Sequence, residues 1–174
     1  MPTALITGIT GQDGLYLAEH LLARGYDVHG VIRGQNNPKR DLVESLLPEV
    51  TLHAGDLTDM SSLIRALRDS DPDEVYNLGA VSFVAYSWEN AALTTDVTAK
   101  GALTALEAVR LHCGDDPRRV RFYQASSSEM FGKVQETPQH ERTLLWPRSP
   151  YGVSKVFGHH MTVNYRESYG MHAS

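Results

Sequence analysis

The sequence predicts an α/β protein with a doubly wound parallel sheet. Apolar runs of strand length alternate with stretches of helical periodicity, the connections between them are short, and a glycine-rich loop follows the first apolar run. Parallel neighbouring strands need crossover connections, and these are almost always right-handed, so helices are expected on both faces of the sheet. No linker rich in glycine, serine or proline divides the 174 residues, which favours one domain.

The first half of the chain is expected to hold four strands, at residues 4–7, 28–32, 50–53 and 74–78. Helices are expected between them, over residues 15–22, near 42–47, and around 63–67. Gly25 is a predicted C-terminal cap for the first of these helices, and Thr58 or Asp59 a predicted N-terminal cap for the third. This alternation of strand and helix is what a parallel sheet requires.

The second half continues the pattern with a long helix over residues 93–111, a strand over 120–125 and a helix over 151–169. Gly170 is expected to end the last helix, and residues 171–174 look like the start of another strand. Because the sequence stops inside this strand, we expect residues 1–174 to be the amino-terminal, cofactor-binding part of a longer protein whose carboxyl-terminal, substrate-binding part is absent.

The composition argues against several classes of protein. With 41% hydrophobic and 21% charged residues, and no apolar run long enough to cross a bilayer, the chain is expected to be soluble, without a membrane partner. A formal net charge of −5 argues against nucleic-acid binding. Cys113 is the only cysteine, so neither an intrachain disulfide nor a thiolate metal site is expected. No secretion signal precedes the first strand, which favours a cytoplasmic location.

Three glycines, Gly8, Gly11 and Gly14, lie between the first predicted strand and the first predicted helix. Glycine permits a tight turn, a close approach of the backbone to a pyrophosphate and close packing of helix on strand, while the helix N-terminus attracts phosphate. The alternative is a glycine turn without chemical function, but the strand before it and the helix after it favour a dinucleotide site in a Rossmann-type sheet. The expected cofactor contacts in this loop are Gly8, Thr10, Gly11, Gln12, Asp13 and Gly14.

Arg33 ends the second predicted strand, where NAD-binding proteins carry an acid for the ribose hydroxyls. A guanidinium at this place can pair with a 2′-phosphate, so NADP is the expected cofactor. The alternative is an arginine that only faces solvent.

Tyr151 and Lys155 are four residues apart, which places them on one face of the last predicted helix. An adjacent ammonium favours the phenolate form of a tyrosine, which suits it to remove a proton from a sugar hydroxyl. On many helices such a pair occurs by chance at the surface. The glycine loop in the same chain favours the catalytic interpretation.

These motifs resemble those of the extended short-chain dehydrogenase/reductase family, in particular its nucleotide-sugar dehydratase branch of the GDP-mannose 4,6-dehydratase type. The resemblance extends from Ala4 to Ser174, and its matching stretches are residues 7–14, 25–30, 76–78, 124–132, 148–152 and 164–168. Ser128 replaces an aspartate that the dTDP-glucose 4,6-dehydratases carry before their catalytic glutamate. Ser127 in place of threonine, Gly34 in place of a second arginine and Val81 in place of glutamine depart from the pattern.

The resemblance implies that Ser127, Glu129, Tyr151 and Lys155 are catalytic. Tyr151 would take the C4 hydroxyl proton of the sugar while Ser127 binds the C4 oxygen and Lys155 holds the nicotinamide ribose. A dehydratase must also remove the C5 proton and expel the C6 hydroxyl, which calls for a carboxylate such as Glu129. Without the resemblance, Glu129 could equally stabilise a helix N-terminus.

The resemblance further implies a contact of Asp56 with adenine, although Asp56 could also cap a helix. GDP-mannose is the implied substrate, and a homodimer or homotetramer through the long helices is the implied assembly. With most of the guanosine contacts in the missing part, the chain alone is expected to be weakly active or inactive. The remaining implied cofactor contacts are Leu57, Leu78, Ala80, Ser82, Tyr151 and Lys155, with Ser82 in a loop over residues 82–86.

Three alternatives stay open. One is an epimerase or reductase of the same fold, for which Glu129 has no obvious use. Another is a protein that senses the dinucleotide without chemistry, which would not need Ser127, Tyr151 and Lys155 together. A metal site at His159 and His160 is less favoured, because neighbours on a helix point about 100° apart.

Overall fold

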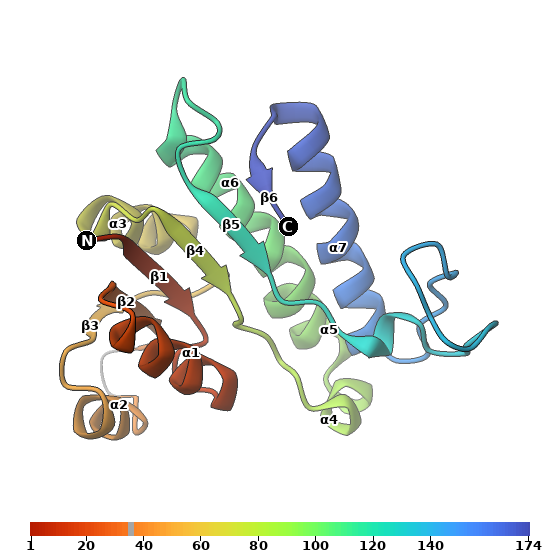
Figure 1. Ribbon diagram of the computed structural model, residues 1–174. Coiled ribbons are helices and arrows are strands. Elements are labelled where there is room, and N and C mark those ends of the chain that lie inside the picture. The colour runs from red at the N-terminus through yellow and green to blue at the C-terminus, as the bar shows by residue number, and fades with distance from the viewer. Residues whose placement is uncertain (35–36) are drawn as a thin grey trace.

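Six parallel strands form one sheet in the order β3-β2-β1-β4-β5-β6 (Figure 1). The computed structural model describes residues 1–34 and 37–174. The strand order reverses between β1 and β4, and in doubly wound sheets ligands bind at the carboxyl edge beside such a reversal. The strands are β1 (Thr3–Thr7), β2 (Asp27–Ile32), β3 (Thr51–Ala54), β4 (Glu74–Asn77), β5 (Arg121–Gln124) and β6 (His172–Ala173). The predicted doubly wound α/β fold is therefore confirmed, including the strand at residues 172–173.

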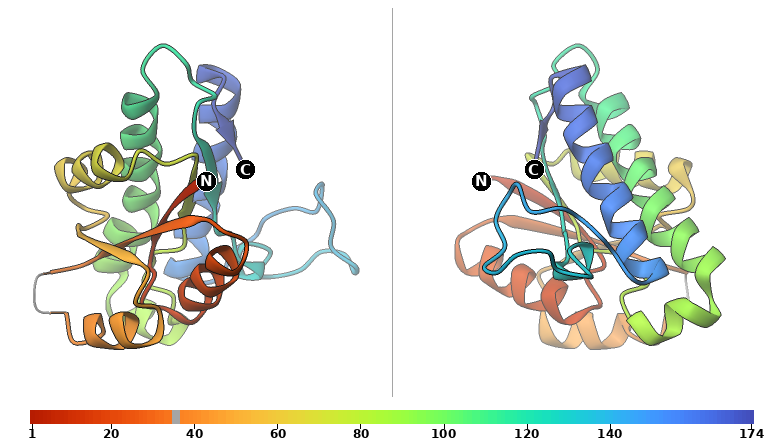
Figure 2. Two further views of the ribbon diagram at one scale, coloured as in Figure 1. Left: turned by 60° about the vertical axis from the view of Figure 1, so that its left-hand side comes forward. Right: turned by 90° about the vertical axis from the view of Figure 1, so that its right-hand side faces the viewer.

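Helices pack on both faces of the sheet, as Figure 2 shows for α1 on one face and for α6 and α7 on the other. Side chains alternate between the faces along each strand. On β1, Ala4 and Ile6 pack with α1 and α2, whereas Leu5 packs with α3 and α6. The helices are α1 (Gln12–Ala23), α2 (Arg40–Leu46), α3 (Met60–Ser70), α4 (Val84–Glu89), α5 (Ala91–Thr94), α6 (Gly101–Cys113) and α7 (Pro150–Tyr169).

The predicted caps Asp59 and Gly170 are confirmed, whereas the C-cap of α1 is Arg24, one residue before the predicted Gly25. The Asp59 carboxylate accepts a hydrogen bond from the Ser61 N–H at 3.0 Å at the start of α3. At the other end of the chain, Gly170 has a φ of +71° and ends α7, and Gly25, with a φ of +78°, follows α1. Because glycine has no Cβ, it adopts these left-handed conformations without strain.

Two predictions for residues 82–113 are wrong in detail. Residues 82–86 are not a simple loop, because α4 begins at Val84. The long helix is not regular, since a π-helical segment, η1 (Thr95–Lys100), separates α5 from α6. Tertiary contacts surround this irregular segment: the Thr98 hydroxyl accepts a hydrogen bond from the Val81 N–H at 3.1 Å, and a Cβ built at Gly101 would lie 2.9 Å from the Cβ of Leu57. Such contacts leave no periodic signal in a sequence.

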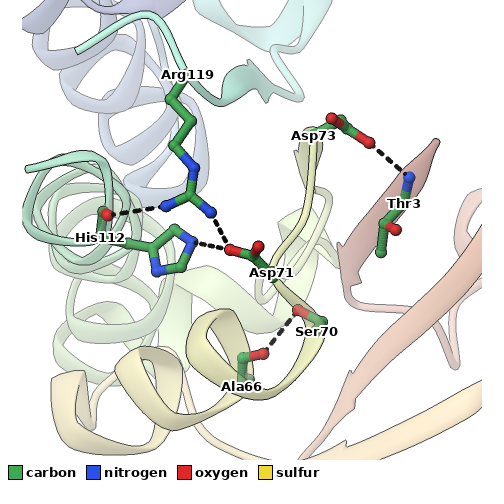
Figure 3. A network of polar contacts seen from close by, with 7 residues as sticks. All are labelled: Thr3, Ala66, Ser70, Asp71, Asp73, His112 and Arg119. Atoms are coloured by element: carbon green, nitrogen blue, oxygen red, sulfur yellow. Dashed lines mark hydrogen bonds and ion pairs between the residues drawn. The ribbon is translucent and has the colours of Figure 1, made fainter. Parts of the chain in front are cut away.

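Charged side chains join three elements at the amino edge of the sheet (Figure 3). Asp71, which follows α3, forms an ion pair with Arg119, which precedes β5. The Nε2 of His112 on α6 lies 3.3 Å from Oδ1 of Asp71. Nearby, the Asp73 carboxylate accepts a hydrogen bond from the Thr3 N–H at 2.8 Å, which fixes the start of β1. We call Asp71, His112 and Arg119 the amino-edge cluster.

Within the described part of the chain, no helix combines the length and the apolar character that crossing a membrane requires.

Candidate active site

A cavity of about 230 Å³ lies at the carboxyl edge, beside the reversal of strand order. Its walls include several of the residues that were expected to contact the cofactor. These are Gly8, Thr10, Arg33, Asp56, Leu57 and Ala80. The cavity also has walls that were not predicted from the sequence, among them Asn37 and Gly79.

The glycine loop wraps one side of this cavity and depends on the absence of side chains. Gly8 has a φ of +73°, and a Cβ there would lie 2.7 Å from the backbone nitrogen of Gly79. A Cβ at Gly14 would collide with the carbonyl oxygen of Gly8. Gly11 precedes α1 and provides no side-chain cap, so no side chain there occupies the first N–H groups of the helix. Free N–H groups at a helix N-terminus bind phosphate.

Arg33 directly follows β2, is exposed and borders the cavity. Its carbonyl oxygen accepts a hydrogen bond from Nδ2 of Asn37 at 2.9 Å. The ammonium of Lys39, which was not predicted to take part, lies 3.4 Å from the Thr10 carbonyl oxygen. Two cationic side chains therefore stand near the glycine loop.

Asp56 borders the cavity but also stabilises the local chain. Its Oδ1 accepts hydrogen bonds from the N–H and from the hydroxyl of Thr58, at 2.8 and 2.7 Å. The cap of α3 is Asp59, so Asp56 is free of that function. The carboxylate can keep these bonds and still use its second oxygen towards a ligand.

The other predicted cofactor residues lie outside this cavity. Gly11 and the first residues of α1 stand at the helix N-terminus, where Gln12 borders a separate apolar groove with Tyr16 and Leu46. Ser82 is exposed just before α4. The remaining predicted cofactor residues are Leu78, which packs on the α1 side of the sheet, and Tyr151 and Lys155, which lie on α7.

Tyr151 and Lys155 occupy the first two turns of α7 and are buried, with exposed fractions of 8% and 5%. The alternative of a chance surface pair is therefore wrong. The Lys155 ammonium lies 5.7 Å from the centre of the Tyr151 ring and donates a hydrogen bond to the Ala125 carbonyl oxygen at 2.8 Å. Burial lowers the pKa of Lys155 to about 8, because removal from water disfavours the charged form.

The start of α7 is fixed by its own sequence. The Ser149 hydroxyl accepts a hydrogen bond from the Gly152 N–H at 3.0 Å, and Pro150 occupies the first turn, where its missing N–H costs no hydrogen bond. These two residues set where the helix begins. They thereby place Tyr151 at its amino end.

The turn after β5 packs against this helix start, as Figure 1 shows. It is a short 3₁₀ helix, η2 (Ser128–Met130), and Ser127 caps it by accepting a hydrogen bond from the Glu129 N–H at 3.2 Å. A Cβ built at Gly152 would lie 2.7 Å from the Glu129 carbonyl oxygen, so only glycine allows this approach. The packing brings the backbone of Glu129 against the turn that carries Tyr151. The Ser127 hydroxyl uses a lone pair in its cap and keeps its proton for another acceptor.

Three buried polar residues behind the site were not predicted from the sequence. Thr7, Asn77 and Gln124 are the last residues of β1, β4 and β5. A polar residue at the carboxyl end of three neighbouring predicted strands is the signal that could have identified them.

His159 and His160 meet edge to face, with ring centres 5.1 Å apart. In residues 1–34 and 37–174, no three histidine, cysteine or carboxylate side chains gather closely enough to hold a metal ion.

Known proteins similar to this chain point to one enzyme family. GDP-mannose 4,6-dehydratase of Yersinia enterocolitica is 52% identical over 99% of this chain, and that of Vibrio cholerae is 54% identical over 98%. The human GDP-mannose 4,6 dehydratase is 47% identical over 98% of the chain. The chain covers 48%, 47% and 47% of these relatives, so it spans about half of their length.

Solved structures support the same fold. UDP-glucose 4-epimerase of Thermus thermophilus, solved with NAD, superposes with a TM-score of 0.83 at 31% identity and matches 97% of this chain and 52% of its own. The Brucella ovis UDP-glucose 4-epimerase, also with NAD, gives 0.79 at 25% identity, over 98% of this chain and 50% of its own. The model of the family described as GDP-mannose 4,6 dehydratase matches residues 5–174. The chain therefore belongs to the GDP-mannose 4,6-dehydratase family.

Proposed function

We propose that this chain carries the cofactor-binding and catalytic residues of an NADP-dependent GDP-mannose 4,6-dehydratase, a hydro-lyase. The reaction converts GDP-mannose to GDP-4-keto-6-deoxy-mannose and water by internal hydride transfer from C4 to C6. The observation that carries the proposal is the packing of the Glu129 turn against the helix start that holds Tyr151 and Lys155. A simple reductase does not need a carboxylate at this place.

The cavity residues fit a dinucleotide. The cradle at Gly8 and Gly14, which a Cβ would fill, and the uncapped start of α1 suit a pyrophosphate. Arg33 would pair with a 2′-phosphate, which favours NADP over NAD, and Asp56 and Ala80, which line the same cavity, would contact the adenosine part. When bound, NADP would accept a hydride from the sugar and return it.

Four side chains then perform the proton chemistry. Tyr151 takes the proton of the C4 hydroxyl, with the buried Lys155 ammonium 5.7 Å from the centre of its ring. The Ser127 hydroxyl donates to the C4 oxygen. Once C4 is a ketone, the C5 proton is acidic, and Glu129 removes it and then protonates the departing C6 hydroxyl. When the hydride is returned to C6, C5 takes a proton that comes from solvent, which completes the 4-keto-6-deoxy sugar.

A nucleotide-sugar 4-epimerase is the second candidate, because the similar solved structures include UDP-glucose 4-epimerases. An epimerase would leave the C5 hydrogen in place and release no water. Incorporation of solvent deuterium at C5, together with loss of water, separates the two reactions.

The test uses a chimera of residues 1–174 with the remaining half of the Vibrio cholerae relative, which is 54% identical over the shared part. With GDP-mannose and NADP in deuterated water, the product should lack one water and carry deuterium at C5. Glu129→Gln should abolish this product while NADPH still binds. An epimerised sugar of unchanged mass would contradict the proposal.

We further propose that residues 1–174 hold the cofactor and that most guanosine contacts lie in the half of the relatives that this chain does not span. The chain alone should therefore turn over GDP-mannose weakly or not at all.

Homo-oligomerisation is proposed through α6 and α7, which expose Leu111, Val153 and Phe157. Analytical ultracentrifugation of the chain and of Phe157→Glu tests this assembly.

A further inference from the structure

Three polar side chains form a buried row across the carboxyl ends of the neighbouring strands β1, β4 and β5. Thr7 pairs with Asn77, and Asn77 pairs with Gln124, in the registers of β1 with β4 and of β4 with β5. Their exposed fractions are 3%, 1% and 6%. They share the face on which Leu5, Val75 and Phe122 pack. Polar groups this deeply buried need partners, and each of them finds one in the row.

The hydrogen bonds of the row all run in one direction. The Thr7 hydroxyl accepts from the Gly79 N–H at 3.1 Å and donates to Oδ1 of Asn77 at 2.6 Å. The Asn77 amide Nδ2 donates to Oε1 of Gln124 at 2.7 Å. With its oxygen bound to Thr7, the Asn77 amide must present its N–H to Gln124, and Gln124 must present its own N–H onward.

The row ends on the atom that binds the catalytic ammonium. Nε2 of Gln124 donates to the Ala125 carbonyl oxygen at 3.2 Å, and Nζ of Lys155 donates to the same oxygen at 2.8 Å. The Ala125 N–H donates to the Asn77 carbonyl oxygen at 3.1 Å, so both ends of this residue are held. Gly158 of α7 faces the amide, since a Cβ built there would lie at van der Waals distance, 3.9 Å, from Cδ of Gln124.

We infer that Gln124 is a positioning residue for Lys155, and that Thr7 and Asn77 orient Gln124, so that the end of the glycine-loop strand controls the environment of the catalytic ammonium. The inference uses the proposed function only to give Lys155 its catalytic role. Lys155 is buried, so its charged form depends on the Ala125 carbonyl, and a displaced carbonyl stabilises that form less. Hydrogen bonds in a chain also polarise one another, which extends the influence of Thr7 along the row.

Other titratable groups near this part of α7 must stay constant in a test. On α7 they are Tyr151, His159 and Arg166, of which His159 and Arg166 line one pocket with Gln124. On the neighbouring elements they are Glu129 in η2, Tyr86 and Glu89 in α4, and the ion pair of Asp96 with Lys100 in η1. The proposed substitutions alter none of them.

The experiment follows the ε-carbons of ¹³C-labelled lysine by NMR while the pH rises from 6 to 11. The chain has four lysines, Lys39, Lys100, Lys133 and Lys155, so the spectrum is simple, and Lys155→Arg assigns the signal. The measurement needs neither cofactor nor substrate. An unchanged Lys155 titration would therefore count against the positioning role alone. The proposed function is tested separately, by the product that the chimera forms.

Thr7→Val removes the hydroxyl at the start of the row, which two side chains and the Ala125 carbonyl separate from the ammonium. We expect the titration midpoint of Lys155 to fall by about half a pH unit, which is about a threefold change in the protonation equilibrium. Thr7→Ser keeps the hydroxyl and should retain the original midpoint. The titration midpoints of Lys100 and of Lys133 should each be the same in every variant as in the wild-type chain.

Gln124→Glu provides a second test if Thr7→Val does not fold. It keeps an oxygen for Asn77 and places a carboxylate one carbonyl away from the ammonium, which should raise the Lys155 midpoint by about one pH unit. A folded Thr7→Val or Gln124→Glu variant with a lower unfolding temperature and an unchanged Lys155 midpoint would overturn the inference, because the row would then be structural only.

Discussion

The two edges of the sheet are held by polar contacts of different kinds. At the carboxyl edge, the row of Thr7, Asn77 and Gln124 is neutral and buried. In the amino-edge cluster, Asp71 and Arg119 form a charged pair that reaches solvent, since their side chains are 65% and 41% exposed, and only His112 is largely buried. Water and salt can replace the contacts of the second group but not those of the first. The buried row beside the candidate site is thus the group in which a lost partner cannot be compensated.

The largest effect is expected at the centre of the buried row. Asn77→Leu leaves the Thr7 hydroxyl and the Gln124 carbonyl oxygen without their partner, and each unpaired buried group costs about 1–3 kcal/mol. We expect the free energy of unfolding in urea to fall by about 3 kcal/mol. Asn164→Leu, on the exposed surface of α7, is the matched control and should change it by less than about 0.5 kcal/mol. Equal losses of unfolding free energy in Asn77→Leu and Asn164→Leu would show that the buried row stabilises the fold no more than a surface side chain does.

The next effect depends on pH and on Lys155. Its pKa in the folded state is about 8, below the ordinary value of 10.5, so between these values the unfolded chain binds more protons. Stability contributed by this group therefore rises with pH, and burial of the ammonium is most costly below pH 8. Relative to Lys155→Met, the wild-type chain should gain about 2 kcal/mol of unfolding free energy from pH 8 to pH 10. Urea titrations of both proteins at each pH measure the difference, and a constant difference would show that Lys155 keeps its ordinary pKa.

The same contrast explains how much could be predicted from the sequence. The glycine loop, the strands and the caps Asp59 and Gly170 act through the local chain, and they were found from spacing and residue type. Tyr151 and Lys155 were found because four residues on a helix share one face. All these signals lie within a few neighbouring positions.

What could not be predicted depends on residues far apart in the chain. Thr7 and Asn77 are 70 positions apart, and Asn77 and Gln124 are 47 apart, so only the strand order brings them together. Gly101, directly after the π-helical segment, lies against the distant Leu57, and the helical periodicity of residues 93–111 does not reveal the segment. The packing of Gly152 on Glu129 is equally a property of the folded chain.

The smallest effect is expected in the amino-edge cluster. Asp71 has a φ of +43°, a left-handed conformation that asparagine also tolerates, so Asp71→Asn removes the charge and leaves the backbone unstrained. The loss of an exposed ion pair with Arg119 should cost about 0.5 kcal/mol in dilute buffer. In 1 M NaCl the two proteins should unfold with equal free energy, because the Debye length is then about 3 Å. The double variant Asp71→Asn with Arg119→Ala should lose no more free energy of unfolding than Arg119→Ala alone. A coupling energy of several kcal/mol between Asp71 and Arg119 that persists in high salt would contradict this prediction. The exposed pair would then stabilise the fold as strongly as the contacts of the buried row do.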